Sequence, residues 1–153
     1  LLDLKPEDYD FVMDVNLRGS LQMAQAVLPA MLAAGVGSIV FMSSVTAQRG
    51  GGVFGGPHYG AAKAGVIGLA KSMAQEFGPA GIRVNAVAPG VIDTDITKGR
   101  RTPEQRLGSV AGAPIERLGT ADEVANACLF LASELSSYTT GSVIDVNGGM
   151  HIH

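Results

Sequence analysis

The chain has 153 residues, of which 46% are hydrophobic and 16% charged, and this composition excludes an intrinsically disordered segment. Its formal net charge of −3 gives no electrostatic reason to expect a nucleic acid or an anionic membrane as a partner. The apolar runs are interrupted before they reach a bilayer-spanning length, and the first residues lack the pattern of a signal peptide. We therefore expect residues 1–153 to form a single globular domain.

The single cysteine, Cys128, excludes an internal disulfide and is typical of a reducing compartment, so we expect a cytoplasmic protein. Cys128 falls in an apolar helical pattern, where a buried thiol is far more common than a nucleophile. His151 and His153 are two metal-ligating side chains without a third nearby in the sequence, so we expect no metal site.

Residues 6–34 are predicted to form one long helix. Pro6 suits the first helical turn, and Gly35 and Gly37 end the pattern. Apolar residues cover most of the circumference of this helix, so we expect it to be buried on nearly all sides. Pro29 cannot donate a backbone hydrogen bond and is expected to bend the last turn.

Two apolar runs bounded by glycine, residues 38–43 and residues 82–88, predict buried strands. Between them, a second helix is expected from Pro57 to about Phe77. Its many glycine and alanine residues would let another helix or a sheet approach closely.

Two capping boxes follow in the second half of the chain, at Thr102–Gln105 and at Thr120–Glu123. They predict a short helix and a third long helix that ends near Leu131. Residues 142–146 are predicted to form a third strand, which two glycines follow at positions 148 and 149. Strands that alternate with long helices indicate an α/β fold with a parallel sheet.

The strongest chemical signal is the pair Tyr59 and Lys63. Four residues apart on a helix, their side chains share one face, with Cβ atoms about 5–6 Å apart. An ammonium group so near a phenol favours the phenolate form, although a free tyrosine has a pKa near 10. Such a tyrosine is a candidate general acid or base.

Other polar residues lie where a site would form in such a fold. Ser43 and Ser44 end the first predicted strand, and ligands of open parallel sheets bind outside the carboxyl ends of the strands. Serines after a strand also serve simple turns. Asn16 lies inside an apolar helix, where asparagine is unfavourable, so it is either a solvated position or part of a polar site.

These patterns together resemble the short-chain dehydrogenase/reductase family. The sequence contains "VNL" around Asn16, "MSSV" around Ser44, "YGAAKAG" from Tyr59, "RVNAVAPGVIDTD" over residues 83–95 and "DVNGG" from Asp145, in the order of that family. The resemblance extends over essentially the whole chain. Within the family, the chain is similar to members of the 3-oxoacyl-[acyl-carrier-protein] reductase type and of the sugar or polyol dehydrogenase type.

The resemblance implies a role for each catalytic residue. Tyr59 would exchange the proton of the substrate oxygen, and Ser44 would hydrogen-bond that oxygen. Lys63 would lower the pKa of Tyr59 and bind the nicotinamide ribose, and Asn16 would hold a water that links Lys63 to solvent. Ser44 is preferred to Ser43 because it directly precedes the valine that often follows this serine in the family.

The resemblance also implies the cofactor and the partners. Pro89, Gly90, Ile92 and Thr94, together with Tyr59 and Lys63, would contact the nicotinamide end of NAD or NADP. The substrate would be a small-molecule alcohol or ketone. The protein would be a homodimer or homotetramer built on the first two long helices.

The glycines at 50, 52 and 55 spell G-x-G-x-x-G, the spacing of a dinucleotide-binding loop. Such a loop should directly follow a strand, and an acidic residue should end the next strand about 20 residues on. Neither condition holds, so we interpret residues 50–56 as a loop beside the substrate cleft.

The expected fold is thus the C-terminal part of a doubly wound parallel-sheet Rossmann fold, with the N-terminal half absent from this sequence. The residue that selects NAD or NADP belongs to that half, so the sequence leaves both open. Two other functions compete with hydride transfer: a non-catalytic oligomerising remnant, and a hydrolase that uses Ser44 with His58. Neither Ser43 nor Ser44 lies in a G-x-S-x-G motif, which disfavours the hydrolase.

Overall fold

The computed structural model describes residues 1–51, 55–95 and 102–153. Its N-terminal part is a continuous helical rod in three segments: α1 (Pro6–Met13), the π-helix η1 (Asp14–Arg18) and α2 (Gly19–Ala34). The sequence predicted one uninterrupted helix and missed the π-helical turn. The rod ends at Gly35, whose φ of 65° is left-handed and suits glycine.

Three parallel strands form the central sheet in the order β1-β2-β5. They are β1 (Gly37–Met42), β2 (Ile82–Pro89) and β5 (Val143–Val146). Gly37 pairs with Ile82 at one end of the sheet and Pro89 with Val146 at the other. The three strands and the parallel sheet predicted from the sequence are confirmed, with boundaries shifted by one residue.

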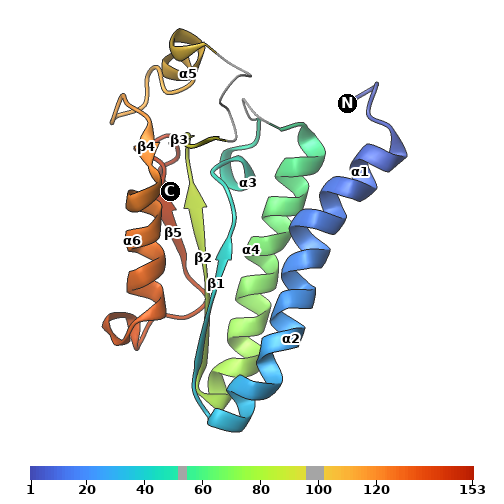
Figure 1. The fold of residues 1–153 in the computed structure, drawn as a ribbon, viewed down its shortest axis with the longest axis vertical. Coiled ribbons are helices and arrows are strands. Elements are labelled where there is room, and N and C mark those ends of the chain that lie inside the picture. Colours follow the sequence, from blue (N-terminus) through green and yellow to red (C-terminus); the bar gives the residue numbers. More distant parts are fainter. Residues whose placement is uncertain (52–54, 96–101) are drawn as a thin grey trace.

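Helices cover both faces of this sheet, as Figure 1 shows. The rod packs beside α4 (Pro57–Phe77) on one face, and α6 (Ala121–Ala132) covers the other. Both predicted capping boxes are present: Thr120 and Glu123 bond reciprocally at the start of α6, and Thr102 and Gln105 do so at α5 (Pro103–Gly108).

Short elements complete the described part of the chain, and most of them were not predicted from the sequence. They are α3 (Thr46–Arg49), the 3₁₀ turns η2 (Gly78–Ala80) and η4 (Glu134–Ser136), and a separate two-stranded parallel pair of β3 (Ile92–Asp93) with β4 (Gly119–Thr120). Strands of two residues carry too little pattern to be predicted from periodicity.

The core is divided between the two faces of the sheet. On one face, buried residues of α2 and α4, such as Leu28 and Val66, pack on Val84 of β2. On the other face, Val124 and Leu131 of α6 pack on Val87 of β2. The central strand β2 is therefore buried on both sides, as in other parallel sheets.

The N-terminal rod is much less buried than its composition predicted. Of its three segments, all within the described part of the chain, only Ala24 and Leu28 are buried. Phe11 is 69% exposed, Val15 58% and Met23 67%. The expectation of burial on nearly all sides is wrong for this single chain, because one face of the rod packs on α4 and the sheet while the opposite face is open.

Candidate active site

Most of the residues predicted to be catalytic or to bind the cofactor lie near the carboxyl ends of β1 and β2 and at the start of α4. Gly56 and Pro57 begin α4, with proline in its first turn. Tyr59 and Lys63 follow one helical turn apart, both half-buried, and Lys63 Nζ lies 5.8 Å from the centroid of the Tyr59 ring. The structure therefore brings the predicted pair together on one face of the helix.

The Lys63 ammonium is directed at the end of β1. Its Nζ donates a 2.8 Å hydrogen bond to the carbonyl oxygen of Met42, the last residue of that strand. Burial lowers the pKa of Lys63 from its ordinary value, because removing the ammonium from water disfavours the charged form. A cation is thus held beside a phenol and near the strand end.

The two serines after β1 have different environments. Ser43 is 3% exposed, and its Oγ donates a 2.9 Å hydrogen bond to the carbonyl oxygen of Lys63 in α4. Ser44 is half-buried, and its Oγ accepts a 3.2 Å hydrogen bond from the backbone N–H of Thr46. Accepting this bond leaves the Ser44 hydroxyl proton for another acceptor, so Ser44 is the serine that can serve a ligand.

Backbone hydrogen bonds continue the sheet beyond the strand ends and hold this region in place. Ser43 N donates to Val87 O at 2.8 Å, and Val45 N donates to Pro89 O at 2.9 Å. Gly90 N donates to Val146 O at 2.9 Å. A Cβ on Gly90 would lie 2.8 Å from Asn147 Cα, so the chain here tolerates only glycine without movement. Ser44 and the Pro89–Gly90 turn consequently lie on neighbouring strand ends.

Asn16 lies at the middle of the π-helical turn, which packs against α4. Its side-chain Nδ2 donates a 2.9 Å hydrogen bond to Val12 O. Its backbone carbonyl oxygen accepts a 2.7 Å hydrogen bond from Ser20 Oγ. Single π-helical turns within α-helices are frequent at functional sites. Asn16 is half-buried, which is compatible with either of its sequence-based interpretations.

The remaining predicted cofactor residues follow β2. Ile92 lies in β3, which is joined to the segment before α6 by a hydrogen bond from Gly119 N to Val91 O of 3.0 Å. Thr94 comes directly after β3. The segment from Pro89 to Thr94 thus leads from the strand ends towards α5.

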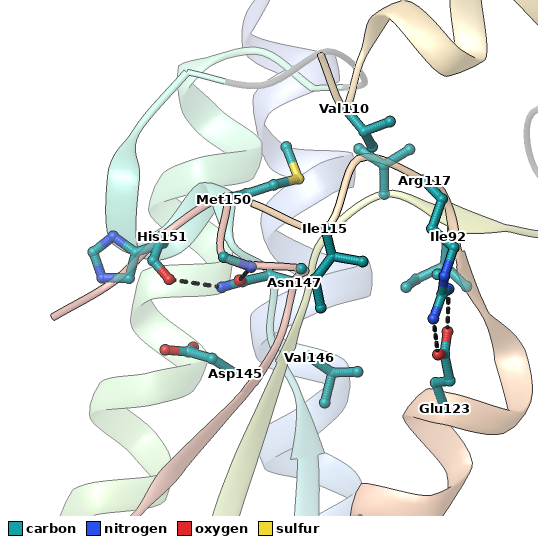
Figure 2. A pocket seen from close by; sticks show the side chains of 14 residues that line it. Ile92, Val110, Ile115, Arg117, Glu123, Asp145, Val146, Asn147, Met150 and His151 are labelled. Carbon is teal, nitrogen blue, oxygen red and sulfur yellow. Dashed lines mark hydrogen bonds and ion pairs between the residues drawn. The ribbon is translucent and has the colours of Figure 1, made fainter. Parts of the chain in front are cut away.

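A cavity of about 420 Å³ opens beyond the carboxyl ends of β2 and β5. Figure 2 shows Ile92, Ile115 and Met150 around it, with the buried amide of Asn147 at its floor. Arg117 and Glu123 form its rim as a bidentate ion pair, with N–O distances of 2.6 and 3.0 Å. The sequence analysis missed this cavity, because its lining comes from five separate segments. The two glycines after β5 were the one local signal.

The described glycines of residues 50–56 do not lie where a dinucleotide fingerprint requires them, and residues 52–54 are outside the described residues. Gly50 follows the helix α3 and not a strand, and Gly52 lies outside the described residues. A Cβ on Gly55 would lie 2.7 Å from ring atoms of Tyr59. This glycine therefore makes room for the Tyr59 ring.

The other reactive side chains lie apart from this arrangement. The His58 ring packs against Gly56, and its Nδ1 is buried with no hydrogen-bond partner among the described residues. Burial raises the pKa of Cys128, which disfavours the thiolate. His153 Nε2 lies 3.1 Å from Asp145 Oδ2. Over the described ranges, no three His, Cys, Asp or Glu side chains are grouped to hold a metal ion.

None of the helices in the described part of the chain is long and apolar enough to cross a membrane.

Comparison with known sequences gives consistent matches. A family model described as enoyl-(acyl carrier protein) reductase matches residues 1–151. The chain is 59% identical over 152 residues to an uncharacterized short-chain type dehydrogenase/reductase, y4mP, of Sinorhizobium fredii. It is 43% identical over 152 residues to the 3-oxoacyl-[acyl-carrier-protein] reductase FabG of Escherichia coli. These alignments cover 99% of the chain but 60% and 61% of the relatives, so the chain spans about three fifths of their length.

Solved structures give the same picture. A 3-oxoacyl-[acyl-carrier protein] reductase of Brucella melitensis matches all of the chain and 56% of its own length, with a TM-score of 0.94 and 39% identity. Another such reductase from Brucella melitensis, with bound NAD, gives a TM-score of 0.91 at 38% identity and is 55% covered by the whole chain. A third structure, described as a 2-deoxy-D-gluconate 3-dehydrogenase of Agrobacterium tumefaciens with bound NADP, has a TM-score of 0.89 and 37% identity. The match covers 97% of the chain and 60% of that protein.

Proposed function

Because the chain belongs to the short-chain dehydrogenase/reductase family and the relatives reported above are named as reductases or dehydrogenases, we propose that it carries the catalytic site of an NAD(P)-dependent oxidoreductase. The proposed reaction interconverts a secondary alcohol and a ketone of small-molecule size. The observation that carries the proposal is the placement of Tyr59 and Lys63 on one helical face, with Ser44 at the carboxyl end of the neighbouring strand. General acid–base chemistry requires such a group, held by rigid elements, near the substrate oxygen.

Each side chain has a defined part in the proposed reaction. Tyr59 gives its phenolic proton to the carbonyl oxygen during reduction and takes it back during oxidation. Ser44 donates a hydrogen bond to the same oxygen through the proton that its contact with Thr46 leaves available. The Lys63 ammonium, 5.8 Å from the ring centroid, stabilises negative charge that develops on the phenol oxygen.

Asn16 would support this exchange from the π-helical turn that packs on α4. Its amide N–H is engaged by Val12 O, which leaves the amide oxygen for a water. In the proposed role, that water connects Lys63 to solvent.

The described residues fit the nicotinamide half of a dinucleotide. In this proposal Lys63 donates to the ribose hydroxyls, and the chain from Pro89 through Gly90 and Ile92 to Thr94, which follows the strand ends, packs against the nicotinamide. When bound, the nicotinamide supplies or accepts the hydride. One solved relative contains NAD and another NADP, so the comparisons leave this preference as open as the sequence does.

The proposal includes a homo-oligomer in the cytoplasm. The exposed apolar face of the N-terminal rod, with Phe11, Val15 and Met23, supports association with a second copy. The single cysteine supports a reducing compartment.

The test is the substitution Tyr59→Phe in the full-length protein, assayed with a panel of ketones and reduced nicotinamide cofactor. We expect kcat to fall at least about 100-fold with an unchanged circular dichroism spectrum, because the substitution removes a proton carrier and leaves the ring in place. Tyr138→Phe removes a fully exposed hydroxyl and is the matched control. More than a tenth of the parent activity in Tyr59→Phe would reject the assignment. No nicotinamide-dependent turnover in the parent would favour the non-catalytic remnant.

A further inference from the structure

The last residue of β1 and the residue that follows it hydrogen-bond to the side chain and to the backbone of the same lysine. Met42, at the end of β1, accepts a hydrogen bond of 2.8 Å from Lys63 Nζ. Ser43, the next residue, donates its hydroxyl proton to the backbone carbonyl of Lys63 at 2.9 Å. The strand end therefore holds the side chain and the main chain of Lys63 at once.

Ser43 itself is fixed in position. Its backbone N–H donates to Val87 O at 2.8 Å, which extends the pairing of β1 with β2 by one residue. It is 3% exposed, and Ala62 and Val66, which lie on the sheet-facing side of α4 next to Lys63, are fully buried. The Ser43 hydroxyl is therefore held in place by the sheet, and it faces α4, where it donates to Lys63 O.

The rest of the contact between α4 and the sheet provides little directional restraint. The buried residues of α4 are mostly small or flexible: Ala62, Val66, Ala70, Met73 and Ala74. Apolar burial is non-directional, so such a surface resists separation better than it resists sliding or rotation of the helix. A hydrogen bond has a narrow range of distances and angles and fixes both.

The position of the Lys63 carbonyl determines where the proposed catalytic groups lie. Tyr59 precedes Lys63 by one turn on the same helix, and Ser44 directly follows Ser43 on the strand end. A bond between Ser43 and Lys63 therefore sets the height and rotation of Tyr59 relative to Ser44. An error of about 1 Å in such a geometry costs on the order of 100-fold in rate.

We propose that Ser43 is a positioning residue, whose hydroxyl locks α4 to the end of β1 so that Tyr59 and Lys63 align with Ser44. The proposal rests on the proposed function of the Tyr59–Lys63–Ser44 site. Ser43 does not contact the substrate in this assignment, and it acts through the Lys63 backbone. The paired serines of the sequence thus divide two tasks: the first sets the geometry and the second serves the ligand.

The chain offers a matched control on the same strand. Ser38, in β1, donates its hydroxyl proton to Leu131 O of α6 at 2.8 Å, a strand-to-helix bond of the same type on the opposite face of the sheet. Replacing Ser38 by alanine removes this bond near the amino end of β1, where Leu131 O also accepts hydrogen bonds from Arg83 and Ser136. The unfolding free energies of Ser43→Ala and Ser38→Ala are measured separately from kcat, so a general loss of stability is distinguished from misplacement of the site.

The experiment compares Ser43→Ala, Ser43→Cys and Ser38→Ala in the full-length protein, with rates corrected for the folded fraction. We expect kcat of Ser43→Ala to fall about 10- to 100-fold, with an altered pH profile of kcat, because misplaced Lys63 no longer assists proton transfer. Ser43→Cys keeps a side chain of similar size with a weak hydrogen-bond donor, so its kcat should lie between that of the parent and that of Ser43→Ala. Ser38→Ala should stay within about threefold of the parent, with an unchanged profile.

Tyr59→Phe, measured in parallel, separates the two proposals. If Tyr59→Phe keeps its activity, the proposed function fails. If Tyr59→Phe is inactive while Ser43→Ala matches Ser38→Ala in kcat and in pH profile, the positioning role alone is overturned. If Ser43→Ala fails to fold, Ser43→Cys decides: unchanged kcat and pH profile overturn the role, and a reduced kcat with an altered profile supports it.

Discussion

Lys63 combines a proposed catalytic task with an unfavourable location. Its ammonium is half-buried, hydrogen-bonded to Met42 O, and its pKa is lowered by desolvation. A residue selected for stability at this point of α4 would be apolar, like its neighbours Ala62 and Val66. The charge is therefore best explained by chemistry, in agreement with the clustering of perturbed pKa values at functional sites.

This reasoning predicts that Lys63→Met stabilises the fold relative to the parent at neutral pH while it removes activity. Because the folded-state pKa of Lys63 is lowered, the unfolded chain holds its proton up to higher pH than the folded one. The parent should gain stability relative to Lys63→Met as pH rises towards the ordinary lysine value of 10.5. Urea unfolding over this pH range measures the difference. Lys71→Met, at an exposed position of α4, should show no such trend.

At this scale, the spacing predicted that Tyr59 and Lys63 share one face of a helix, and the structure places Lys63 Nζ 5.8 Å from the Tyr59 ring centroid. The role of Ser44 came from the family resemblance and stays a prediction. Residue types and spacing were not enough to show what Ser43 does. Successive residues of a strand point to opposite faces, so one of two adjacent serines faces α4, but the sequence does not fix which one. The sequence also could not predict that Nδ1 of His58 is buried without a hydrogen-bond partner among the described residues, because this depends on tertiary packing at the start of α4.

Among the elements, α6 shows how a predicted local motif extends into tertiary structure. Glu123 closes the capping box with Thr120 and also binds Arg117 in a bidentate pair. The hydrogen bonds from Arg117 and then from the Thr120 backbone lower the pKa of Glu123 from 4.5 to about 2. The start of α6 and the rim of the cavity are thus held by one carboxylate.

Glu123→Gln should therefore destabilise the protein in a pH-dependent way. A lowered folded-state pKa contributes stability above the ordinary value of 4.5, and this contribution disappears as pH falls through about 2. The difference in unfolding free energy between parent and variant should shrink over that interval. Thr120→Ala, which removes the other half of the cap, should cost about 1 kcal/mol. A pH-independent difference would contradict the assigned pairing.

The segment from residue 92 to residue 113, of which residues 96–101 lie outside the described part of the chain, is expected to act as a lid over the substrate. It contains the short helix α5, and Glu104, Gln105 and Leu107 in that helix are exposed. Segments with few buried contacts open readily, and gating loops belong to this class. Amide hydrogen exchange without cofactor should be much faster over residues 102–113 than over β2. Equal protection of the two segments would exclude a lid.

Periodicity predicted the long elements well, because each is long enough to show its repeat. The π-helical turn at Asn16 was not predictable. Its extra residue shifts the apolar phase of the following helix by about 100°, and apolar residues on both sides of the rod hide such a shift. Nor could periodicity tell which apolar face of the rod packs inside the chain, because apolar residues occur on both sides.

For the whole molecule, the open apolar face of the rod predicts self-association. Phe11, Val15 and Met23 are spaced by multiples of four residues, so they form one stripe along α1, η1 and α2. Sedimentation of the full-length protein should give a dimer or tetramer at micromolar concentration. Met23→Glu should shift it towards monomer, whereas Val36→Glu, at an exposed position beyond the rod, should not. A monomeric parent would contradict the prediction.

The last prediction concerns the 153-residue chain by itself, which spans about three fifths of its relatives. Lys63 and the segment from Pro89 to Thr94 are proposed to contact only the nicotinamide end of a dinucleotide. Pyrophosphate normally binds to backbone amides at a glycine-rich helix N-terminus that follows a strand, and the glycines at 50–56 follow α3 instead.

We therefore expect this chain to bind NADH and NADPH weakly and to turn over slowly or not at all. Losing the binding energy of the adenosine half raises KM first, and it lowers kcat where that energy positions the reacting ring. In the described sheet β1 is also an edge strand, which leaves backbone groups open to solvent. Calorimetric titration with both cofactors tests the prediction. Micromolar binding of either one would contradict it and would assign the phosphates to another part of the chain, with the loop at 50–56 as the first segment to mutate.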